Sequence, residues 1–352
     1  MAQPALAESL PTASRLCELV NSMAGQPVVM CVDLVADRFI TGTPKRISRE
    51  APVLILKHEK EEFVPGGGAN AVANVSALGG RPLPLGVVGT DANGVELINW
   101  LDKNRVPTEG IARIEGYRTP TKTRVLGGGR HSIKQQIVRF DIEDQVIFDD
   151  NIASLYSRAL ESWKGSAKIA VLSDYGYGAV QPQHVGPLRQ TLGESGVVLC
   201  DSRHRLADFA GVDGATPNEE EAENLVGERL DDGSKRLREA GKRLRKDLRT
   251  SFVLITRGSC GMSLFEADRV AHIPTHGSDQ VADVTGAGDT VIGTFALALA
   301  AGATPLEAAL VADYAGGIVV HKLGTATTDA DELKVAIQTD PLPLAEVSWD
   351  RF

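Results

Sequence analysis

Cysteine is scarce in this sequence, and its cysteines form no recognisable cluster. Cys17, Cys31, Cys200 and Cys260 lie far apart, with no CxxC pair and no Cys/His spacing of a metal site. The pattern argues against a disulfide framework and against a structural zinc site. Chains without disulfides are typical of reducing compartments, so we expect a cytoplasmic protein.

Long apolar runs and targeting signals are missing as well. Residues 1–23 lack the basic start and unbroken apolar core of a signal peptide. The longest apolar stretch, FALALAA with its flanks, is too short to span a bilayer. GxxxxGK[ST], HExxH and GxSxG, the patterns of P-loop, zinc-protease and serine-hydrolase sites, do not occur. The net charge of −9 opposes binding to nucleic acid or to anionic membranes, and we expect neither partner.

Apolar segments that are present alternate with segments of helical pattern. The chain of 352 residues is 43% hydrophobic, which is enough for one large core. Continuous apolar runs of the kind expected for strands covered on both faces are PVVMCVDLV, LPLGVVG, IAVLSD, VVLCDS and FVLITRG. Their alternation with helices predicts an α/β fold with a doubly wound, mostly parallel sheet flanked by helices.

Two segments depart from this rhythm. Residues 52–64 and 121–144 alternate polar and apolar positions and suit strands with one wet face. We expect them to form a small antiparallel β lid that leaves the main sheet and returns. A small sheet with an apolar face needs a cover, which predicts a homodimer formed through the lid.

Residues 216–249 are helical in pattern and heavily charged. An acidic run, TPNEEEAENLVGERLDD, is followed by a basic one, KRLREAGKRLRKDLRT. Leu237, Leu244 and Leu248 recur on one helical face. A packed helix with a solvated basic face explains this better than a nucleic-acid site, because the acidic run would cancel the field that a phosphate backbone needs.

The stretch DVTGAGDTVIG, residues 283–293, places three small residues and a carboxylate at the start of an apolar helix. Helix N-termini carry unpaired N–H groups and a partial positive charge, so they favour anions. Gly286 and Gly288 let an anion approach the backbone. At an ordinary pKa of ~4, Asp289 is ionised at neutral pH and suited to take a proton from a hydroxyl that attacks phosphorus. The alternative is a capped, buried helix in which Asp289 only satisfies the first turn.

Two separate signatures resemble those of the PfkB carbohydrate kinases, a ribokinase-like family. PGGGANAVANVSALGG (65–80) is similar to the N-terminal signature of the family, and DVTGAGDTVIG to its C-terminal one. The resemblance covers residues 27–337, with an N-terminal extension at 1–26, a tail at 338–352 and lid strands at about 38–64 and 113–144. It implies an ATP-dependent kinase that transfers the γ-phosphate to a sugar hydroxyl.

Within the family, the chain is most similar to kinase modules that phosphorylate the anomeric hydroxyl of D-glycero-D-manno-heptose 7-phosphate, a precursor of ADP-heptose and lipopolysaccharide. The segments that carry this likeness are DRFITGTPKRISREAPV (37–53), TKTRVL (121–126), QQIVRFDIED (135–144), VLSDYGYGAV (171–180), TPNEEEAE (216–223) and KLGTATT (322–328). Bifunctional relatives continue into a nucleotidyltransferase domain. Such a domain does not fit after residue 337, so we expect no adenylyl transfer.

For phosphoryl transfer, the resemblance implies Asp289 as the catalytic base. Gly286, Ala287 and Gly288, with the Asp289 amide, would form an anion hole. ATP would bind with Mg²⁺, which Glu221 would hold through water, and K⁺ would order the anion hole. The resemblance assigns Asn218, Glu221, Thr256, Gly258, Gly261 and Gly324 to the nucleotide, and Asp283 and Thr285 to K⁺.

For the sugar, the resemblance implies that Asp33, at the end of the first strand, accepts hydrogen bonds from hydroxyls. The substrate residues assigned in this way are Asp33, Gly66, Gly67, Asn70, Lys122, Arg124 and Asp174. The 7-phosphate needs cations from the lid, and the candidates are Arg38, Lys122, Arg124 and Arg139, with Arg124 first. Each of them is alternatively an exposed surface charge. GGGANA also fits a dinucleotide-binding G-x-G-x-x-A, but the charged segment before it does not suit a buried parallel strand.

Three features depart from the family pattern. Val32 stands where a glycine usually precedes the aspartate, and Tyr177 replaces a lysine of the SDYxKG element. GGGRHSIK (127–134) lengthens the lid hairpin and either forms a loop tip or replaces the missing charge through Arg130, His131 and Lys134. These differences leave open a kinase of another sugar or sugar phosphate. A non-catalytic sugar- or nucleotide-binding protein is a third possibility.

Overall fold

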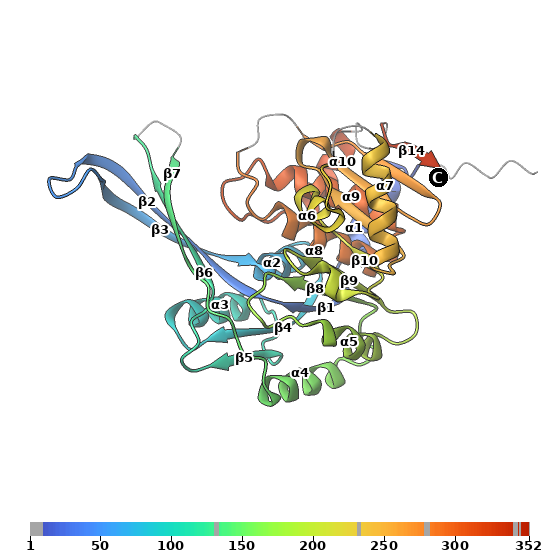
Figure 1. The fold of residues 1–352 in the computed structure, drawn as a ribbon, viewed down its shortest axis with the longest axis horizontal. Coiled ribbons are helices and arrows are strands. Elements are labelled where there is room, and N and C mark those ends of the chain that lie inside the picture. The colour runs from blue at the N-terminus through green and yellow to red at the C-terminus, as the bar shows by residue number, and fades with distance from the viewer. Residues whose placement is uncertain are drawn as a thin grey trace, which may run out of the picture.

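The computed structural model describes residues 10–129, 134–230, 234–277, 282–340, 344 and 346–351. Its two parts are a body, in which helices surround a large sheet, and a lid of four strands that projects from one side of the body (Figure 1). The predicted α/β class with a mostly parallel sheet and a β lid is confirmed.

The main sheet has ten strands in the order β14-β13-β12-β11-β10-β9-β8-β1-β4-β5. From β11 to β5 every neighbouring pair is parallel, whereas β12, β13 and β14 add an antiparallel edge. The strands are β1 Pro27–Val32, β4 Arg81–Gly89, β5 Ile111–Ile114, β8 Ile169–Asp174, β9 Val197–Ser202, β10 Gly214–Ala215, β11 Phe252–Thr256, β12 Met262–Phe265, β13 Arg269–Ile273 and β14 Ser348–Arg351.

Helices cover both faces of this sheet, which explains the continuous apolar runs. In β1, Val28, Met30 and Val32 face one buried cluster, and Val29 and Cys31 face the other. Successive strand side chains point to opposite faces, so a strand buried on both faces is apolar throughout. The helices are α1 Ala13–Ser22, α2 Gly68–Ala77, α3 Ala92–Lys103, α4 Asp150–Ser162, α5 Val185–Leu192, α6 Glu219–Val226, α7 Ser234–Asp247, α8 Ala287–Ala300, α9 Pro305–Val319 and α10 Ala330–Thr339.

The lid consists of two hairpins that lie side by side. β2 (Leu34–Ile47) pairs with β3 (Leu54–Gly67), and β6 (Thr121–Gly127) pairs with β7 (Gln135–Ile142), both antiparallel. The hairpins meet through a parallel pairing of β2 with β6. The first lid strand therefore starts at Leu34, earlier in the chain than the expected residue 38. The segment at residue 113, which we expected in the lid, belongs to β5 of the main sheet.

Both ends of the described chain join the body. In α1, Leu16, Leu19 and Val20 are buried in the same cluster as α8, α9 and α10. We expected an irregular, partly docked end after residue 338; its described residues 348–351 are docked, as strand β14 paired with β13 at the edge of the sheet. Arg269 lies 4.6 Å from the ring centroid of Trp349, so a cation–π contact holds the edge strand in place.

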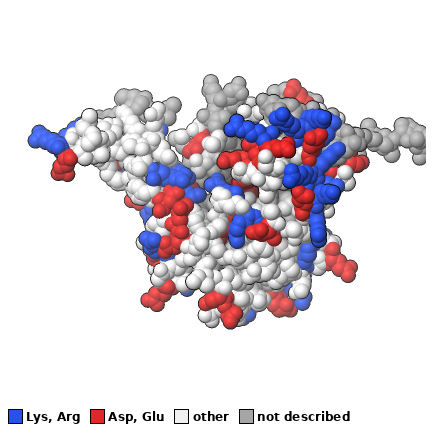
Figure 2. Space-filling model, in the orientation of Figure 1, with Lys and Arg blue, Asp and Glu red and all other residues white. Residues whose placement is uncertain are grey.

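The charged segment forms α6 and α7, and its basic half packs as predicted. Leu237 and Leu244 are buried in one cluster with β11, and Leu248, directly after α7, is buried in another. Figure 2 shows Lys and Arg side chains gathered over α7, next to acidic side chains. Within the described residues, no helix has both the length and the apolar composition that a membrane crossing requires.

Candidate active site

The helix that carries Asp289 begins with a glycine that no other residue replaces without strain. Gly286 is the N-cap of α8 and has a φ of +80°. A Cβ atom at this position would lie 2.5 Å from Nδ2 of Asn70. The bare backbone therefore brings α2 against the start of α8. Asp289 follows in the first turn and is 3% exposed.

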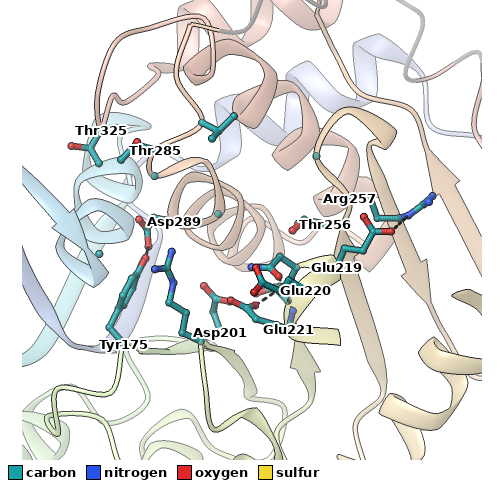
Figure 3. A pocket seen from close by; sticks show the side chains of 18 of the residues that line it. Tyr175, Asp201, Glu219, Glu220, Glu221, Thr256, Arg257, Thr285, Asp289 and Thr325 are labelled. Carbon is teal, nitrogen blue, oxygen red and sulfur yellow. Dashed lines mark hydrogen bonds and ion pairs between the residues drawn. The ribbon is translucent and has the colours of Figure 1, made fainter. Parts of the chain in front are cut away.

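The carboxylate of Asp289 is held from two sides. The hydroxyl of Tyr175 donates to Oδ1 at 2.7 Å, and Nδ2 of Asn70 donates to Oδ2 at 3.3 Å. The same Asn70 nitrogen donates to the Gly286 carbonyl at 3.1 Å. Figure 3 shows the Tyr175 side chain pointing toward the neighbouring Asp289 at one side of the cavity. Asn70, which we assigned to the sugar, therefore contacts the residue assigned as the base.

Burial raises the pKa of Asp289 to about 7, although the hydrogen bonds from Tyr175 and Asn70 and the charge of Arg203 lower it. This corrects the expectation of an ordinary carboxylate that is fully ionised at neutral pH. A base with a pKa near the working pH is well matched to proton transfer.

The first turn of α8 offers fewer amides than the expected anion hole. The Ala287 N–H donates to the Val284 carbonyl at 3.2 Å. The amides of Gly288 and Asp289 lie in the first helical turn, which has no intrahelical acceptors for its N–H groups. A Cβ atom on Gly288 would meet nothing within 4 Å, so this position is open toward a ligand.

A cavity of about 1040 Å³ lies in front of Asp289 and brings together many of the predicted residues. The predicted residues that line it are Gly67, Lys122, Arg124, Arg139, Asp174, Asn218, Glu221, Thr256, Gly258, Thr285, Gly286, Gly288 and Asp289. Those that lie outside its lining are Asp33, Arg38, Gly66, Asn70, Gly261, Asp283, Ala287 and Gly324.

At one side of the cavity, Asn218 and Glu221 form a reciprocal cap on α6. Oδ1 of Asn218 accepts from the Glu221 N–H at 2.8 Å, and Oε2 of Glu221 accepts from the Asn218 N–H at 2.9 Å. Asp201 and Glu220 lie nearby (Figure 3). Burial is the main cause that raises the pKa of Glu221, and the charge of Glu220 adds to it. The motif thus fixes a carboxylate at the cavity wall.

The loop after β11 supplies the next part of the wall. Gly258 lines the cavity, and its carbonyl accepts a hydrogen bond from the Thr275 hydroxyl at 3.1 Å. Gly261 turns the chain with a φ of +77°, where a Cβ would lie 2.0 Å from the Ile273 carbonyl oxygen. Gly261 therefore shapes the loop.

Asp283 links the two loops next to the start of α8. Its Oδ1 accepts from the Thr285 N–H at 2.9 Å, and its Oδ2 accepts from the Gly324 N–H at 3.1 Å. A carboxylate oxygen has lone pairs beyond the one used by each amide. The role in a cation site that we assigned to Asp283 and Thr285 stays a prediction.

Asp33 does not face the cavity, and Asp37 does. The Asp33 carboxylate is 1% exposed and accepts backbone N–H bonds from Tyr175, Tyr177 and Ala179 at 2.8 to 3.0 Å. Asp33 thus shapes the loop after β8, and burial raises its pKa to about 6. Asp37, four residues on, lines the cavity and was not predicted.

Asp174 lines the cavity, but Arg205 already occupies its carboxylate. Nη2 of Arg205 lies 2.6 Å from Oδ1 of Asp174, and the Ser202 hydroxyl donates to Oδ2 at 2.6 Å. A buried carboxylate with these partners anchors the loops that follow β8 and β9.

The four cations proposed for the phosphate have different surroundings. Nη1 of Arg124 lies 2.9 Å from Oδ1 of Asp37 in a buried ion pair. Arg38 lies between Glu61 and Glu96, at 2.5 Å from each, outside the cavity. Lys122 and Arg139 line this cavity and a second one.

The second cavity, of about 620 Å³, adjoins the first. Lys122, Arg139, Tyr175 and Arg203 line both. The residues that line the second cavity alone are Glu143, Gln145, Val146, Gly176, Tyr177, Gly178, Gln181, His204 and Arg205. Cations therefore outnumber carboxylates around it, which suits an anion.

We did not predict Tyr175 and Arg203 as site residues, although each directly follows a buried strand. Tyr175 follows the end of β8, and Arg203 follows the end of β9. Ligands of open α/β sheets bind outside the carboxyl ends of the strands, so the first residue after each buried run is a candidate.

The three departures from the family pattern lie in different places. Val32 is fully buried against the start of α2, where a Cβ on Gly68 would come within 2.6 Å of it. Tyr177 lines the second cavity. Arg130 and His131 lie outside the described residues, and Lys134 reaches across the lid to Glu59 at 2.9 Å.

A carboxylate at a helix N-terminus beside a cleft combines a proton acceptor with amides that favour an anion, which suits transfer of a phosphoryl group to a hydroxyl. The family model of the pfkB carbohydrate kinases matches residues 26–332. The chain belongs to this family of carbohydrate kinases, which confirms the predicted enzyme class.

Curated relatives share the family and extend further than this chain. Bifunctional protein HldE of Mesorhizobium japonicum is 37% identical over 331 residues, which cover 93% of this chain and 65% of that protein. HldE of Pseudomonas aeruginosa is 40% identical over 316 residues, which cover 89% and 64%. The chain therefore spans about two thirds of the length of these relatives.

Solved structures show the same fold at low identity. Escherichia coli phosphofructokinase-2 in complex with potassium has a TM-score of 0.72 and 19% identity, covering 89% of this chain and 98% of that one. Arabidopsis thaliana ribokinase complexed with ribose and ATP has a TM-score of 0.69 and 20% identity, covering 90% and 100%. The predicted ribokinase-like architecture is confirmed.

Proposed function

We propose that the chain transfers the γ-phosphate of ATP to the anomeric hydroxyl of D-glycero-D-manno-heptose 7-phosphate, giving the 1,7-bisphosphate. The observation that carries this proposal is the pair of cavities that meet at Tyr175. One contains the carboxylate of Asp289, and the other is lined by four Lys or Arg side chains and one carboxylate. A sugar with its reacting hydroxyl at Asp289 and a phosphate at its far end fits this arrangement.

In this proposal, Asp289 accepts the proton of the anomeric hydroxyl while that oxygen attacks the γ-phosphorus. The O–H bond breaks, the new O–P bond forms, and ADP leaves with the electrons of the old O–P bond. The amides of Gly288 and Asp289 hold the charge that builds up on the phosphoryl oxygens. The wall formed by Asn218, Glu221, Thr256 and Gly258 is the nucleotide side.

Magnesium fits the nucleotide side of the cavity as an ion shared between a carboxylate, water and the ATP phosphates. In the part of the chain that the structure describes, no three His, Cys, Asp or Glu side chains form a group that could hold a metal ion. Glu221, with Asp201 and Glu220 nearby, supplies the hard oxygen donors that Mg²⁺ prefers, and Mg²⁺ usually keeps several waters beside nucleotide phosphates. When bound, Mg²⁺ would offset the charge of the ATP phosphates. Asp283 and Thr285 remain the proposed site of K⁺.

The similarity to HldE proteins supports heptose 7-phosphate as the acceptor, because it extends over about nine tenths of this chain. The second candidate is a kinase of another sugar or sugar phosphate. Tyr177 favours it, since this residue lines the cation-rich cavity where related kinases carry a lysine.

We also propose that the lid pairs two copies of the chain. Among the described residues, the large apolar side chains exposed on the lid include Ile47, Val53, Leu54, Ile137, Val138 and Phe140. A gathering of apolar side chains on one small sheet is typical of an interface.

The test is a panel of acceptors scored by ADP release. The panel holds heptose 7-phosphate, the unphosphorylated heptose, and hexose and pentose phosphates, each with MgATP. We expect turnover with heptose 7-phosphate and a product with a new anomeric phosphate in phosphorus NMR. Activity confined to another sugar phosphate would favour the second candidate, and activity confined to unphosphorylated sugars would exclude the proposal.

A further inference from the structure

Tyr175 lies where the two cavities meet and lines both of them. It follows directly after β8, in a loop whose backbone amides at 175, 177 and 179 are fixed by the buried carboxylate of Asp33. Its ring is half-buried. The backbone of Tyr175 is therefore held in place by the end of β8 and by the hydrogen bonds to Asp33.

Its hydroxyl makes the shorter of the two hydrogen bonds that Asp289 receives from side chains, 2.7 Å against 3.3 Å from Asn70. The two donors act on different oxygens of the same carboxylate, so together they fix its plane. Each oxygen keeps a lone pair for an incoming hydroxyl.

The ring of Tyr175 contacts two cations at the boundary of the cavities. Nζ of Lys122 and Cζ of Arg203 each lie 5.2 Å from the ring centroid. Lys122 comes from strand β6 of the lid, and Arg203 follows β9 of the body. Cation–π contacts at this distance hold both groups beside Asp289.

We propose that Tyr175 is a positioning residue of phosphoryl transfer, whose hydroxyl aims the Asp289 carboxylate at the acceptor and whose ring holds Lys122 and Arg203 at the mouth of the second cavity. This inference rests on the proposed role of Asp289 as the base. A carboxylate that is free to rotate spends less time in the productive orientation, which lowers the rate of proton transfer.

The pKa of Asp289 depends on the charged groups around it as well as on the hydroxyl of Tyr175. Arg203 favours the ionised carboxylate, Asp37 opposes it, and Asp201 is a further carboxylate whose charge couples to that of Asp289. Tyr175 stays protonated, because burial raises its pKa well above the ordinary value. It is thus a permanent donor to the ionised form, and its loss raises the pKa of Asp289.

The decisive variant is Tyr175→Phe, which keeps the ring and removes the hydroxyl. We expect kcat to fall roughly tenfold to hundredfold, as for loss of one hydrogen bond to a charged group. The acid limb of the kcat/KM profile should move to higher pH, and KM for ATP should stay unchanged. Should this variant fail to fold, Tyr175→Leu, which also removes the hydroxyl and adds no titratable group, carries the same pH comparison.

Tyr314→Phe is the matched control. Its hydroxyl also makes a 2.7 Å bond, to the Asp340 carbonyl, and has no contact with Asp289. It should leave the pH profile in place, and thermal unfolding of both variants measures any loss of stability.

An unchanged pH profile and kcat in well-folded Tyr175→Phe would overturn the inference. Asp289→Asn separates this failure from that of the proposed mechanism. Retained turnover in Asp289→Asn rejects the base itself. Lost turnover there, with a normal Tyr175→Phe enzyme, rejects only the role of Tyr175.

Discussion

The carboxylate of Asp37 and the guanidinium of Arg124 form a 2.9 Å ion pair inside the lid, and their side chains are 3% and 9% exposed. Asp37 lies on β2 and Arg124 on β6, so the pair ties the two hairpins together where they face the cavity. Arg124 was the first choice for the substrate phosphate, but its charge is already compensated. We therefore expect the proposed phosphate recognition to depend more on Lys122 and Arg139.

Arg139→Ala should weaken binding of a phosphorylated acceptor. Arg139 lines both cavities, and its side chain is 48% exposed, whereas its ion-pair partner Asp141 is 14% exposed. We expect KM for the sugar phosphate to rise roughly tenfold to hundredfold while KM for ATP stays constant, as for loss of one charge-assisted hydrogen bond. Steady-state kinetics measures both constants.

The control for this prediction is Arg46→Ala. Arg46 is an exposed arginine of the same lid that lines neither cavity. Equal effects of the two variants on acceptor KM would show that Arg139 acts only through the general charge of the lid.

Activity should depend on pH through Asp289. The pKa of this carboxyl is raised to about 7 by burial, and the base works only when ionised. We therefore expect kcat/KM to fall about tenfold per pH unit below that value and to level off above it. Asp289→Asn should lose roughly 10²- to 10⁴-fold in kcat while MgATP still binds in calorimetry. A flat profile between pH 5.5 and 8 would contradict the assignment.

Stability should depend on pH through a different carboxyl, Asp313 of α9. It is 2% exposed and accepts the His276 N–H at 2.9 Å, and burial raises its pKa to about 8. Between about pH 4 and pH 8 the folded state keeps a proton that the unfolded state releases, so stability falls as pH rises.

Asp313→Asn keeps an oxygen acceptor and needs no proton. When the pH rises from 5.5 to 8.5, the Tm of the parent should therefore fall by several degrees relative to that of the variant. This corresponds to a change in the relative free energy of unfolding on the order of 1 kcal/mol or more. The same Tm difference at both pH values would reject this prediction.

Phe140→Glu should separate the proposed dimer. Phe140 on β7 is 56% exposed, and a charge there opposes burial in an interface. Analytical ultracentrifugation should give a dimer for the parent and a monomer for the variant. The control is Val95→Glu, an exposed apolar position on α3 that should leave the dimer intact. A monomeric parent at micromolar concentration would reject the proposal.

The sequence predicted the elements whose pattern is local. The apolar runs identified the strands of the parallel sheet, and small residues before an apolar helix identified the start of α8. The motif that begins with Asn218 forms the capping box of α6, which is likewise a local pattern of four consecutive residues, although we assigned it only to the nucleotide and Mg²⁺.

Residues whose role depends on distant partners could not be assigned in the same way. Asp33 and Asp37 both follow the first apolar run. Asp33 turns inward to three backbone amides from residues 175–179, and Asp37 faces the cavity. Only the loop after β8, far away in the sequence, decides between them. The pKa of Asp289 likewise depends on Tyr175 and on burial by other elements.

The course of the chain from β3 into α2 places the lid close to the proposed base. β3 ends at Gly67, α2 begins at Gly68, and Asn70 holds the carboxylate of Asp289. A shift of β3 relative to the body would therefore reach the proposed base through a few covalent bonds and one hydrogen bond. Contact of an acceptor with the lid and proton abstraction at Asp289 would then be linked by the connectivity of the chain.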